Sequence, residues 1–388
     1  MTITAPLSSV LSTSLLLGDT TSNQVLLFSP LLLPAPQSQP TYPNYTFPPA
    51  RLDPPSLPEF TLPTIDLIVI PTSSSPTLQG LDQSHCAIRA ANVSTGGLAQ
   101  GTRNMVVNAT TEWSAIGGIE GYRTYWVLGG LLPGTNYTAW YTDGEENISQ
   151  PIWFRTKQCK YLSFPLQFIP YRRNQTLIRT LASFPCQLVL PNEYCPSIGY
   201  AAPLEPNSTA ILSSSAPLTT FPDPIITLLT SSLDSFATTL STKACGRDFY
   251  SHVSSCFDCH TSYRDWICRN LVPRCADPSL IESLAPDIIP PRNIQVPLST
   301  TTSPRGVTTS PISPTYGYDQ LLPCLGVCNR VDRTCPAFVE FTCPHRGVNA
   351  NETYGFFGQD DGRGDGSSSS ETIARASDKW GNSWCNGP

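Results

Sequence analysis

Five of the fourteen cysteines lie in one stretch, from Cys245 to Cys275, and their spacing limits the chemistry that is possible there. Cysteines at metal-ligand spacing can hold zinc, whereas an even number of cysteines in an exported chain typically forms disulfides. Cys259 and Cys268 are nine residues apart, so at about 100° per residue they point to roughly opposite sides of a helix. One tetrahedral metal ion could not take both ligands from an unbroken helix. The spacing therefore favours two disulfides that leave the helix in different directions.

Catalytic chemistry has little support in the sequence. A hydrolase needs a nucleophile, a base and an orienting acid, and none of the four histidines stands in a nucleophile elbow or at metal-ligand spacing. His260 follows Cys259, but a disulfide-bonded Cys259 has no thiolate to offer, and we expect His260 to be exposed. The acidic run from Asp361 to Glu371 departs from an EF-hand calcium loop, because Arg363 occupies the third position. We therefore predict no enzyme activity, no cofactor and no metal.

Two predicted helices position the central cysteines. Between Ser255 and Asn270 the apolar residues follow helical spacing, Ser255 can cap the first turn, and Pro273 must end the helix. An earlier helix is predicted to start at Asp223 and Pro224, because the apolar residues that follow keep the same spacing. The central cysteines are thus expected on a helix and on the segments around it.

The cysteine count and the glycosylation motifs indicate the cellular compartment. Fourteen cysteines are unusual in a reduced cytosolic chain, and eight N-x-[ST] motifs accompany them. Only 13% of the residues are charged and the net charge is -6, so no basic patch is available for phosphates and nucleic acid is not expected as a partner. The sequence therefore predicts passage through the secretory pathway, with glycosylation candidates at Asn44, Asn92, Asn108, Asn136, Asn147, Asn174, Asn207 and Asn351.

Residues 1–62 are rich in proline and are predicted to form a disordered stalk or linker. Their runs LLLPAPQSQPTYP and FPPARLDPPSLPEFTLP lack an amide donor at every proline and suit neither a sheet nor a helix. No signal peptide is visible in residues 1–33, and no run of about 20 apolar residues that could span a membrane occurs in the chain. Because disulfides and glycans both require export, we expect the signal to lie upstream of Met1.

A β-sandwich module is predicted over residues 63–160. Short strand-like runs, IDLIVI, YRTYWVL, YTAWY and PIWFRT, alternate there with Gly, Asn and Pro turns. The segment GGLLPGTNYTAWYTD resembles the corner of fibronectin type III domains, in which a tyrosine hydroxyl bonds back to the backbone, and Tyr137 would be that tyrosine. An ordinary hairpin with Pro-Gly at its turn is the alternative. Cys86 and Cys159 are the cysteines near this module and are expected to close its ends.

Residues 161–388 are predicted to form a mainly helical, disulfide-rich domain. A Pro/Ser/Thr-rich loop near 277–318 and a Gly/Ser-rich loop near 358–374 interrupt it, and both are expected to be disordered or flexible. The predicted fold class is therefore α+β with two domains. Disulfides are needed to hold the second domain together, because its helices and long loops bury little apolar area by themselves.

Several long, cysteine-anchored segments carry a family resemblance. The segments EYCPSIGYAAP, YSHVSSCFDCHTSYRDWICRNLVPRC, CNRVDRTCP and DKWGNSWCN resemble the fungal stretch-activated calcium-channel component family over about residues 80–388. The resemblance implies a glycosylated auxiliary subunit at the extracellular face of the plasma membrane, with the endoplasmic reticulum as a second location. Its implied partner is the pore-forming subunit of a voltage-gated-type calcium channel. Members of the family usually have a longer N-terminal region behind a signal.

The cysteine spacing is also similar to that of frizzled-type cysteine-rich domains, which this family shares with animal sodium-leak-channel auxiliary subunits. Carried over by position, that similarity implies a connectivity for ten cysteines and leaves two further pairs. The implied pairs are Cys186 with Cys275, Cys195 with Cys268, Cys259 with Cys335, Cys324 with Cys385 and Cys328 with Cys343, and the remaining pairs are Cys245 with Cys256 and Cys86 with Cys159.

Three hypotheses for function follow. The first is the auxiliary channel subunit, the second a secreted frizzled-like module that binds a lipid or peptide in an apolar groove, and the third a cell-wall or adhesion protein. Exposed aromatic residues are the usual anchors of an interface. The candidates for partner contact, for each of which a core position is the stronger interpretation, are Tyr263, Trp266, Trp380 and Trp384.

Overall fold

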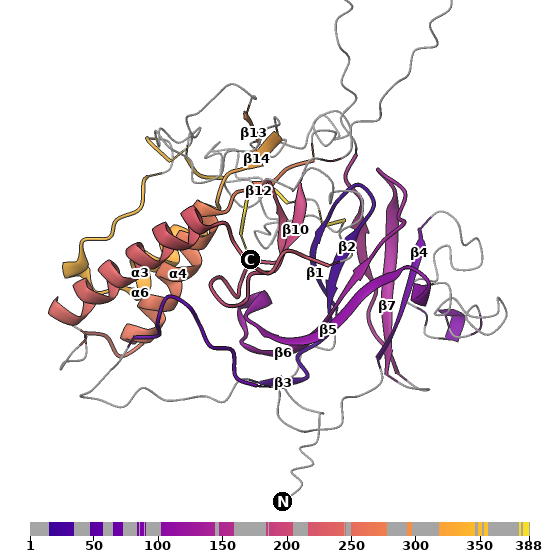
Figure 1. The fold of residues 1–388 in the computed structure, drawn as a ribbon, viewed down its shortest axis with the longest axis horizontal. Helices are drawn as coiled ribbons and strands as arrows, with labels where there is room; N and C mark the ends of the chain where they lie inside the picture. The colour runs from indigo at the N-terminus through magenta and orange to yellow at the C-terminus, as the bar shows by residue number, and fades with distance from the viewer. Residues whose placement is uncertain are drawn as a thin grey trace, which may run out of the picture.

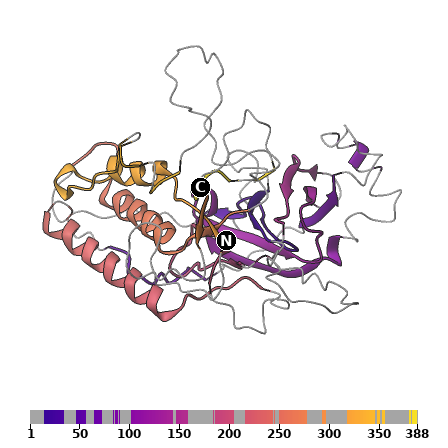
Figure 2. The same cartoon turned by 90° about the horizontal axis from the view of Figure 1, so that it is seen from above.

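A computed structural model shows two antiparallel sheets at one end of the molecule and three helices at the other (Figures 1 and 2). The described residues are 15–34, 47–56, 65–72, 84, 86–88, 90, 102–143, 147–158, 184, 186–204, 216–243, 245, 250–277, 293–296, 318–345, 348–350, 353–355, 380–381 and 383–387.

A five-stranded antiparallel sheet forms the centre of the molecule. Its strands are β1 (Leu16–Thr20), β2 (Val25–Phe28), β3 (Leu33–Pro34), β5 (Val106–Ser114) and β6 (Gly121–Leu128). β6 pairs with β2 and β3 along one edge and with β5 along the other. Successive side chains of β2 alternate between two different cores, Val25 and Leu27 on one face and Leu26 and Phe28 on the other. A strand that is buried on both faces reads as a continuous apolar run, which explains the sequence VLLF.

This sheet corrects the prediction of a stalk over residues 1–62. β1, β2 and β3 lie within that range. β2 and β3 pair with β6, about a hundred residues later in the chain, and β1 pairs with β2. Residues 47–56 are also described, and Ala50 belongs to a buried core. The proline-rich sequence hid these elements because short apolar runs between prolines resemble a linker when their pairing partner is distant in sequence. The parts of the predicted stalk at 1–14, 35–46 and 57–62 lie outside the described residues.

A four-stranded sheet packs on one face of the five-stranded sheet. It consists of β4 (Ile65–Pro71), β7 (Asn136–Asp143), β8 (Asn147–Ile148) and β9 (Ile152–Arg155), with β7 in the middle. Val69 and Phe154 of this sheet share a core with Leu27 and Trp126 of the other. Tyr137 is buried, and its hydroxyl accepts a hydrogen bond of 2.8 Å from the Leu132 backbone N–H. The backbone contact predicted for Tyr137 therefore forms.

Short strands and three longer helices provide most of the remaining regular structure among the described residues. The strands are β10 (Gln187–Val189), β11 (Tyr200–Ala202), β12 (Arg274–Cys275), β13 (Asn293–Val296) and β14 (Tyr318–Leu321). The helices are α3 (Asp223–Lys243), α4 (Cys256–Leu271) and α6 (Leu325–Thr334), with 3-10 turns η2 (Ile116–Gly118) and η3 (Ala337–Val339). β13 pairs with β14 inside the predicted loop near 277–318, which is therefore not irregular throughout. Most of that loop, and the loop near 358–374, lie outside the described residues.

α4 begins where the sequence predicts. Ser255 accepts a hydrogen bond from the Asp258 backbone N–H, and the Asp258 carboxylate accepts one from the Ser255 backbone N–H, which completes a capping box. Val272 ends the helix immediately before Pro273. α3 also starts at Asp223 as predicted. Local sequence signals thus define both helices.

The two predicted domains share one interior. The second face of the five-stranded sheet, with Leu26 and Tyr125, packs against Leu188, Cys275 and Tyr318 of the cysteine-rich part. The molecule is thus a stack of four-stranded sheet, five-stranded sheet and cysteine-rich layer. Residue 160 does not separate two independent cores, because the central sheet is buried from both sides.

Candidate functional site

α4 is the element on which the disulfides converge. Three of its residues, Cys256, Cys259 and Cys268, are disulfide-bonded, and the last two leave the helix toward different partners. The structure contains six disulfides among its described residues. Five of them are the pairs implied by the resemblance to frizzled-type domains, and the sixth, Cys245–Cys256, is a pair of cysteines that this resemblance left over. The six are Cys186–Cys275, Cys195–Cys268, Cys245–Cys256, Cys259–Cys335, Cys324–Cys385 and Cys328–Cys343.

The pair predicted for the β module does not form. Cys86 is a free and exposed cysteine, and Cys159 lies outside the described residues. The proposal that these two cysteines close the module rested on their being the nearest ones in sequence. Sequence proximity carries no information about whether two Cα atoms come within disulfide distance.

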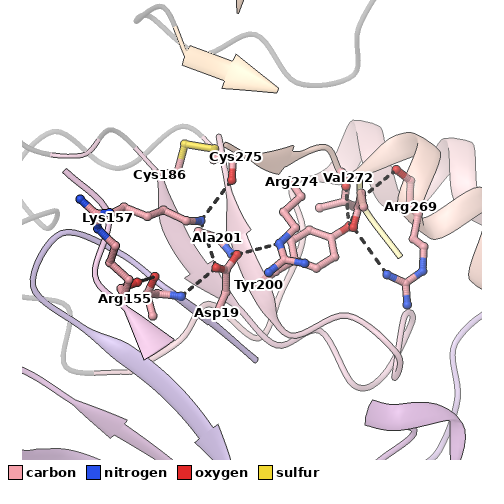
Figure 3. A network of polar contacts seen from close by, with 12 residues as sticks. Asp19, Arg155, Lys157, Cys186, Tyr200, Ala201, Arg269, Val272, Arg274 and Cys275 are labelled. Atoms are coloured by element: carbon pink, nitrogen blue, oxygen red, sulfur yellow. Dashed lines mark hydrogen bonds and ion pairs between the residues drawn. A yellow bond between two sulfur atoms is a disulfide. The ribbon is translucent and has the colours of Figure 1, made fainter. Parts of the chain in front are cut away.

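A buried polar junction ties the central sheet to the cysteine-rich layer (Figure 3). Asp19 at the end of β1 is 3% exposed, and its carboxylate accepts hydrogen bonds from four donors. Lys157 Nζ lies 3.0 Å from Oδ1 and Arg274 Nε lies 2.9 Å from Oδ2. The backbone N–H groups of Thr20 and Ala201 donate to the two oxygens at 2.8 and 3.0 Å. Donors from three distant parts of the chain thus join the adjacent Thr20 amide on one carboxylate.

The charges of this junction stabilise one another. Burial alone would raise the pKa of the Asp19 carboxyl, but the Arg274 and Lys157 cations and the hydrogen bonds from Arg274 and Ala201 outweigh burial and lower the pKa to about 2. Burial lowers the pKa of Lys157, and the negative charge of Asp19 counteracts that effect. Lys157 also donates to the Cys275 carbonyl at 3.1 Å. An ion pair that is fully hydrogen-bonded can exist in the interior, where an isolated charge could not.

The junction continues toward the C-terminal segment through Tyr200. Its hydroxyl donates to the Val272 carbonyl at 2.6 Å and accepts a hydrogen bond from Asn386 Nδ2 at 3.1 Å. Burial raises the pKa of Tyr200 to about 12, so this hydroxyl stays protonated. Arg269 of α4 then pairs with Asp265 at 2.9 Å. The end of α4, β11 and the last described residues are thus joined by one hydrogen-bond network (Figure 3).

Hydrogen bonds, ion pairs and disulfides make up the arrangement around α4 and Asp19. Among the described residues, no group of three or more His, Cys, Asp or Glu side chains could hold a metal ion. Every cysteine near α4 is in a disulfide, so the predicted absence of a thiolate at Cys259 agrees with the structure. The sequence analysis missed Asp19, Lys157 and Arg274. The available signal was the rarity of charge, since Asp19 is the first charged residue of a chain in which only 13% of the residues are charged.

The four aromatic candidates for partner contact are all partly buried. Tyr263 stacks on Phe236 with 3.7 Å between ring centroids, and Trp266 donates from Nε1 to the Tyr354 hydroxyl at 2.9 Å. Both therefore contribute to the contacts of α4 with its neighbours. Trp380 accepts a hydrogen bond at its carbonyl from the Arg155 backbone N–H at 3.0 Å. Tyr263 and Trp266 contact each other. No contact among the described residues joins all four aromatic candidates into one patch.

A groove lies between α3 and α4. It has a volume of about 380 Å³ and is lined by Phe236 and Tyr263 together with four hydroxyl side chains of α3, Ser231, Ser232, Ser235 and Thr239. The lipid-binding hypothesis required an apolar groove. The hydroxyl lining of this groove does not suit an acyl chain.

The glycosylation candidates are described in part. Asn108 lies on the edge strand β5 and Asn136 opens the central strand β7, while only the backbone of Asn147 is described, in β8. The predicted sites that lie outside the described residues are Asn44, Asn92, Asn174, Asn207 and Asn351.

His260 departs from the expectation that it is exposed. Its side chain is 1% exposed, and burial together with the nearby Arg264 cation lowers its pKa to about 4. Its aromatic neighbour Phe47 comes from residues 47–56, a segment that the sequence had indicated to be a linker, and Arg264 of α4 donates to the Ala50 carbonyl of the same segment.

Comparison with known proteins identifies the class. The chain belongs to the Mid1 family of stretch-activated Ca²⁺-permeable channel components, whose family model matches residues 8–370. This is a family of channel components and not of enzymes. Six disulfides and this family are consistent with a membrane-associated protein of the secretory pathway.

Two fungal relatives are similar along most of this chain. The stretch-activated cation channel MID1 of Cryptococcus neoformans is 41% identical, over 98% of this chain and 60% of the relative. The stretch-activated cation channel yam8 of Schizosaccharomyces pombe is 24% identical, over 76% of this chain and 52% of the relative. The chain thus spans between half and two thirds of the length of these relatives. No solved structure matches it. None of the helices in the described ranges is long and apolar enough to cross a membrane.

Proposed function

We propose that this chain is an extracellular, glycosylated auxiliary subunit of a plasma-membrane calcium channel that docks on the pore-forming subunit and supports calcium influx. The family match over residues 8–370 carries the proposal. The proposed partner is the pore-forming subunit of a voltage-gated-type calcium channel.

The architecture supports a role outside the membrane. Six disulfides require an oxidising compartment. The pairing around α4 follows the frizzled-type pattern, and the hydrogen bond of the Tyr137 hydroxyl agrees with a fibronectin-type corner. We therefore include a frizzled-like cysteine-rich part and a fibronectin-like sandwich in the proposal.

The buried junction fits a subunit that transmits a displacement. The Asp19 junction and the shared core connect the sheets to β12, which follows α4 closely in the chain, so a load applied at one end reaches the other through close-packed structure. Tyr263, Trp266, Trp380 and Trp384 remain the proposed partner contacts. Each of them is partly exposed to solvent.

The proposal is tested by affinity purification of the tagged chain from detergent-solubilised fungal membranes, with an unrelated exported glycoprotein carrying the same tag as control. The expected result is recovery of the pore-forming calcium-channel subunit with the chain and not with the control. Recovery of the chain as a partnerless species from the medium would support a secreted binding module or a wall protein instead.

A further inference from the structure

A proline-rich segment, residues 47–56, lies across the molecule as a strap. Figure 1 shows it as the indigo segment that runs from the helices toward β3. Four of its ten residues are prolines, which have no N–H to donate. The strap is therefore held mainly through its carbonyl oxygens, which accept hydrogen bonds from side chains of the body.

Three places on the body hold the strap. Arg264 of α4 donates to the Pro49 carbonyl at 2.6 Å and to the Ala50 carbonyl at 2.7 Å. The Leu52 backbone N–H donates to the Glu193 carbonyl at 2.6 Å. At the far end, the Tyr122 hydroxyl of β6 lies 2.7 and 2.9 Å from the carbonyl oxygens of residues 55 and 56. The strap thus bridges the helices and the central sheet.

His260 lies beneath the first residue of the strap. The ring centroids of Phe47 and His260 are 5.3 Å apart, and His260 is 1% exposed. Neither ring nitrogen of His260 has a hydrogen-bond partner in the described part of the chain. An imidazole in such a place is accommodated only as the neutral form, because a buried cation without an acceptor is costly.

Among the described residues, no acidic group forms an ion pair with His260. The Arg264 cation, one turn along α4, repels a positive charge on His260. The nearby Glu120 carboxylate favours the charged form of Arg264. Other charged groups lie on the elements around His260, and in the described part of the chain none of them forms an ion pair with it. These groups are Asp258 of α4, Arg51 and Asp53 of the strap, Glu193, the exposed Asp234 of α3, and the exposed Arg330, Asp332 and Arg333 of α6.

The strap can move more easily than the helix beneath it. α4 is fixed by disulfides at Cys256, Cys259 and Cys268, whereas the strap contains no cysteine. Its ion pair between Arg51 and Glu193 is exposed on both sides and contributes little. When His260 gains a proton, the way to hydrate the ring is therefore to release Phe47.

We propose that residues 47–56 form an acid-releasable strap, in which protonation of His260 expels Phe47 and detaches the strap from α4. The docked strap disfavours a proton on His260. As the pH falls below about 6.5, the released state therefore binds more protons at His260 than the docked state does. Docking is therefore complete at neutral pH and weakens as the pH falls toward 4. With the pKa of His260 lowered from 6.5 to about 4, docking should weaken by about 10²-fold over this range.

Hydrogen exchange read by mass spectrometry at pH 7.0 and 4.5, corrected for intrinsic chemical rates, tests the strap directly. The Leu52 amide reports docking, and α4 is the internal reference. We expect the strap to lose about 10²-fold of its protection at pH 4.5 while α4 keeps its own. Equal protection of the strap at both pH values, or loss in the strap and α4 together, would overturn the proposal.

Two variants identify the sensor. His260→Phe keeps a ring for Phe47 and cannot titrate, so the strap should stay protected at pH 4.5. His252→Phe removes an exposed histidine and should leave the pH dependence unchanged. Persistence of the dependence in His260→Phe would contradict the proposal. If that variant misfolds, NMR can follow the ring titration of His260 in the unmodified protein. The midpoint of this titration must coincide with the midpoint of strap release, and a mismatch between the two would contradict the proposal.

Discussion

Asp19 remains ionised in the interior because four donors surround it, and the two cations among them depend on it in return. Asp19→Asn would remove the carboxylate that pairs with both buried cations, Lys157 and Arg274. We expect the free energy of unfolding to fall by about 3–5 kcal/mol, measured by denaturant titration without reductant. Asp66→Asn is the matched control, since its pair with Arg103 is exposed and should be worth less than about 1 kcal/mol.

The acid limb of the stability curve provides a second measurement on Asp19. Its pKa of about 2 lies below the ordinary value of 3.8, so the unfolded state binds more protons between these two values. The stabilisation by Asp19 is thus fully present above about pH 4 and is lost as the pH falls to 2. If the free energy of unfolding fell equally with pH between 4 and 2 in the parent protein and in Asp19→Asn, the ionised Asp19 carboxylate would not be a source of the stability.

The two described glycosylation candidates differ in their surroundings. Asn136 belongs to a central strand, its Oδ1 is buried, and its neighbour Thr138 is 2% exposed. Asn108 lies on an edge strand beside the exposed Val107. We predict that Asn108→Gln removes one endoglycosidase-sensitive glycan from the protein made in a eukaryotic host, while Asn136→Gln leaves its mobility unchanged. The reverse pattern would contradict the assignment.

Residues such as Asp19 could not be placed from sequence. Its partner Arg274 is 255 residues away, and no local pattern connects them. His260 was misjudged for the same reason, since Phe47 covers it from a segment that looked like a linker. The cysteines were accessible to sequence reasoning because a family spacing supplied the long-range information.

At the scale of elements, α4 is the best-predicted part of the chain. Its cap, its start and its end all follow from local signals at Ser255, Asp258 and Pro273. The strands β1 to β3 were missed, because a strand is specified by a partner that local sequence does not reveal. Proline between short apolar runs made that segment look like a stalk.

The disulfides of α4 give the sharpest test at this scale. Cys268→Ser breaks the bond to Cys195, which closes a long loop, and should cost about 2–5 kcal/mol. We expect retention and degradation of this variant in the secretory pathway, measured by pulse-chase. Cys86→Ser, which replaces a free and exposed cysteine, should change stability by less than about 0.5 kcal/mol. Comparable secretion of the two variants would mean that the disulfide framework is not required for folding.

At the scale of the whole molecule, the three layers form one body. The five-stranded sheet is buried on one side by the four-stranded sheet and on the other by the cysteine-rich layer. The sequence predicted the β-rich and helical parts and their order, but not that they share an interior, because that depends on contacts between distant segments. The buried central sheet therefore makes the two predicted domains mechanically continuous.

Current recordings test the central claim most directly. The pore-forming calcium-channel subunit and this chain are expressed separately and together, and calcium current is measured in membrane patches under suction. The account predicts no current from this chain alone and a larger stretch-dependent current from the pair than from the pore-forming subunit alone. A calcium current from this chain by itself, or an equal current with and without it, would contradict the proposed role as an auxiliary subunit.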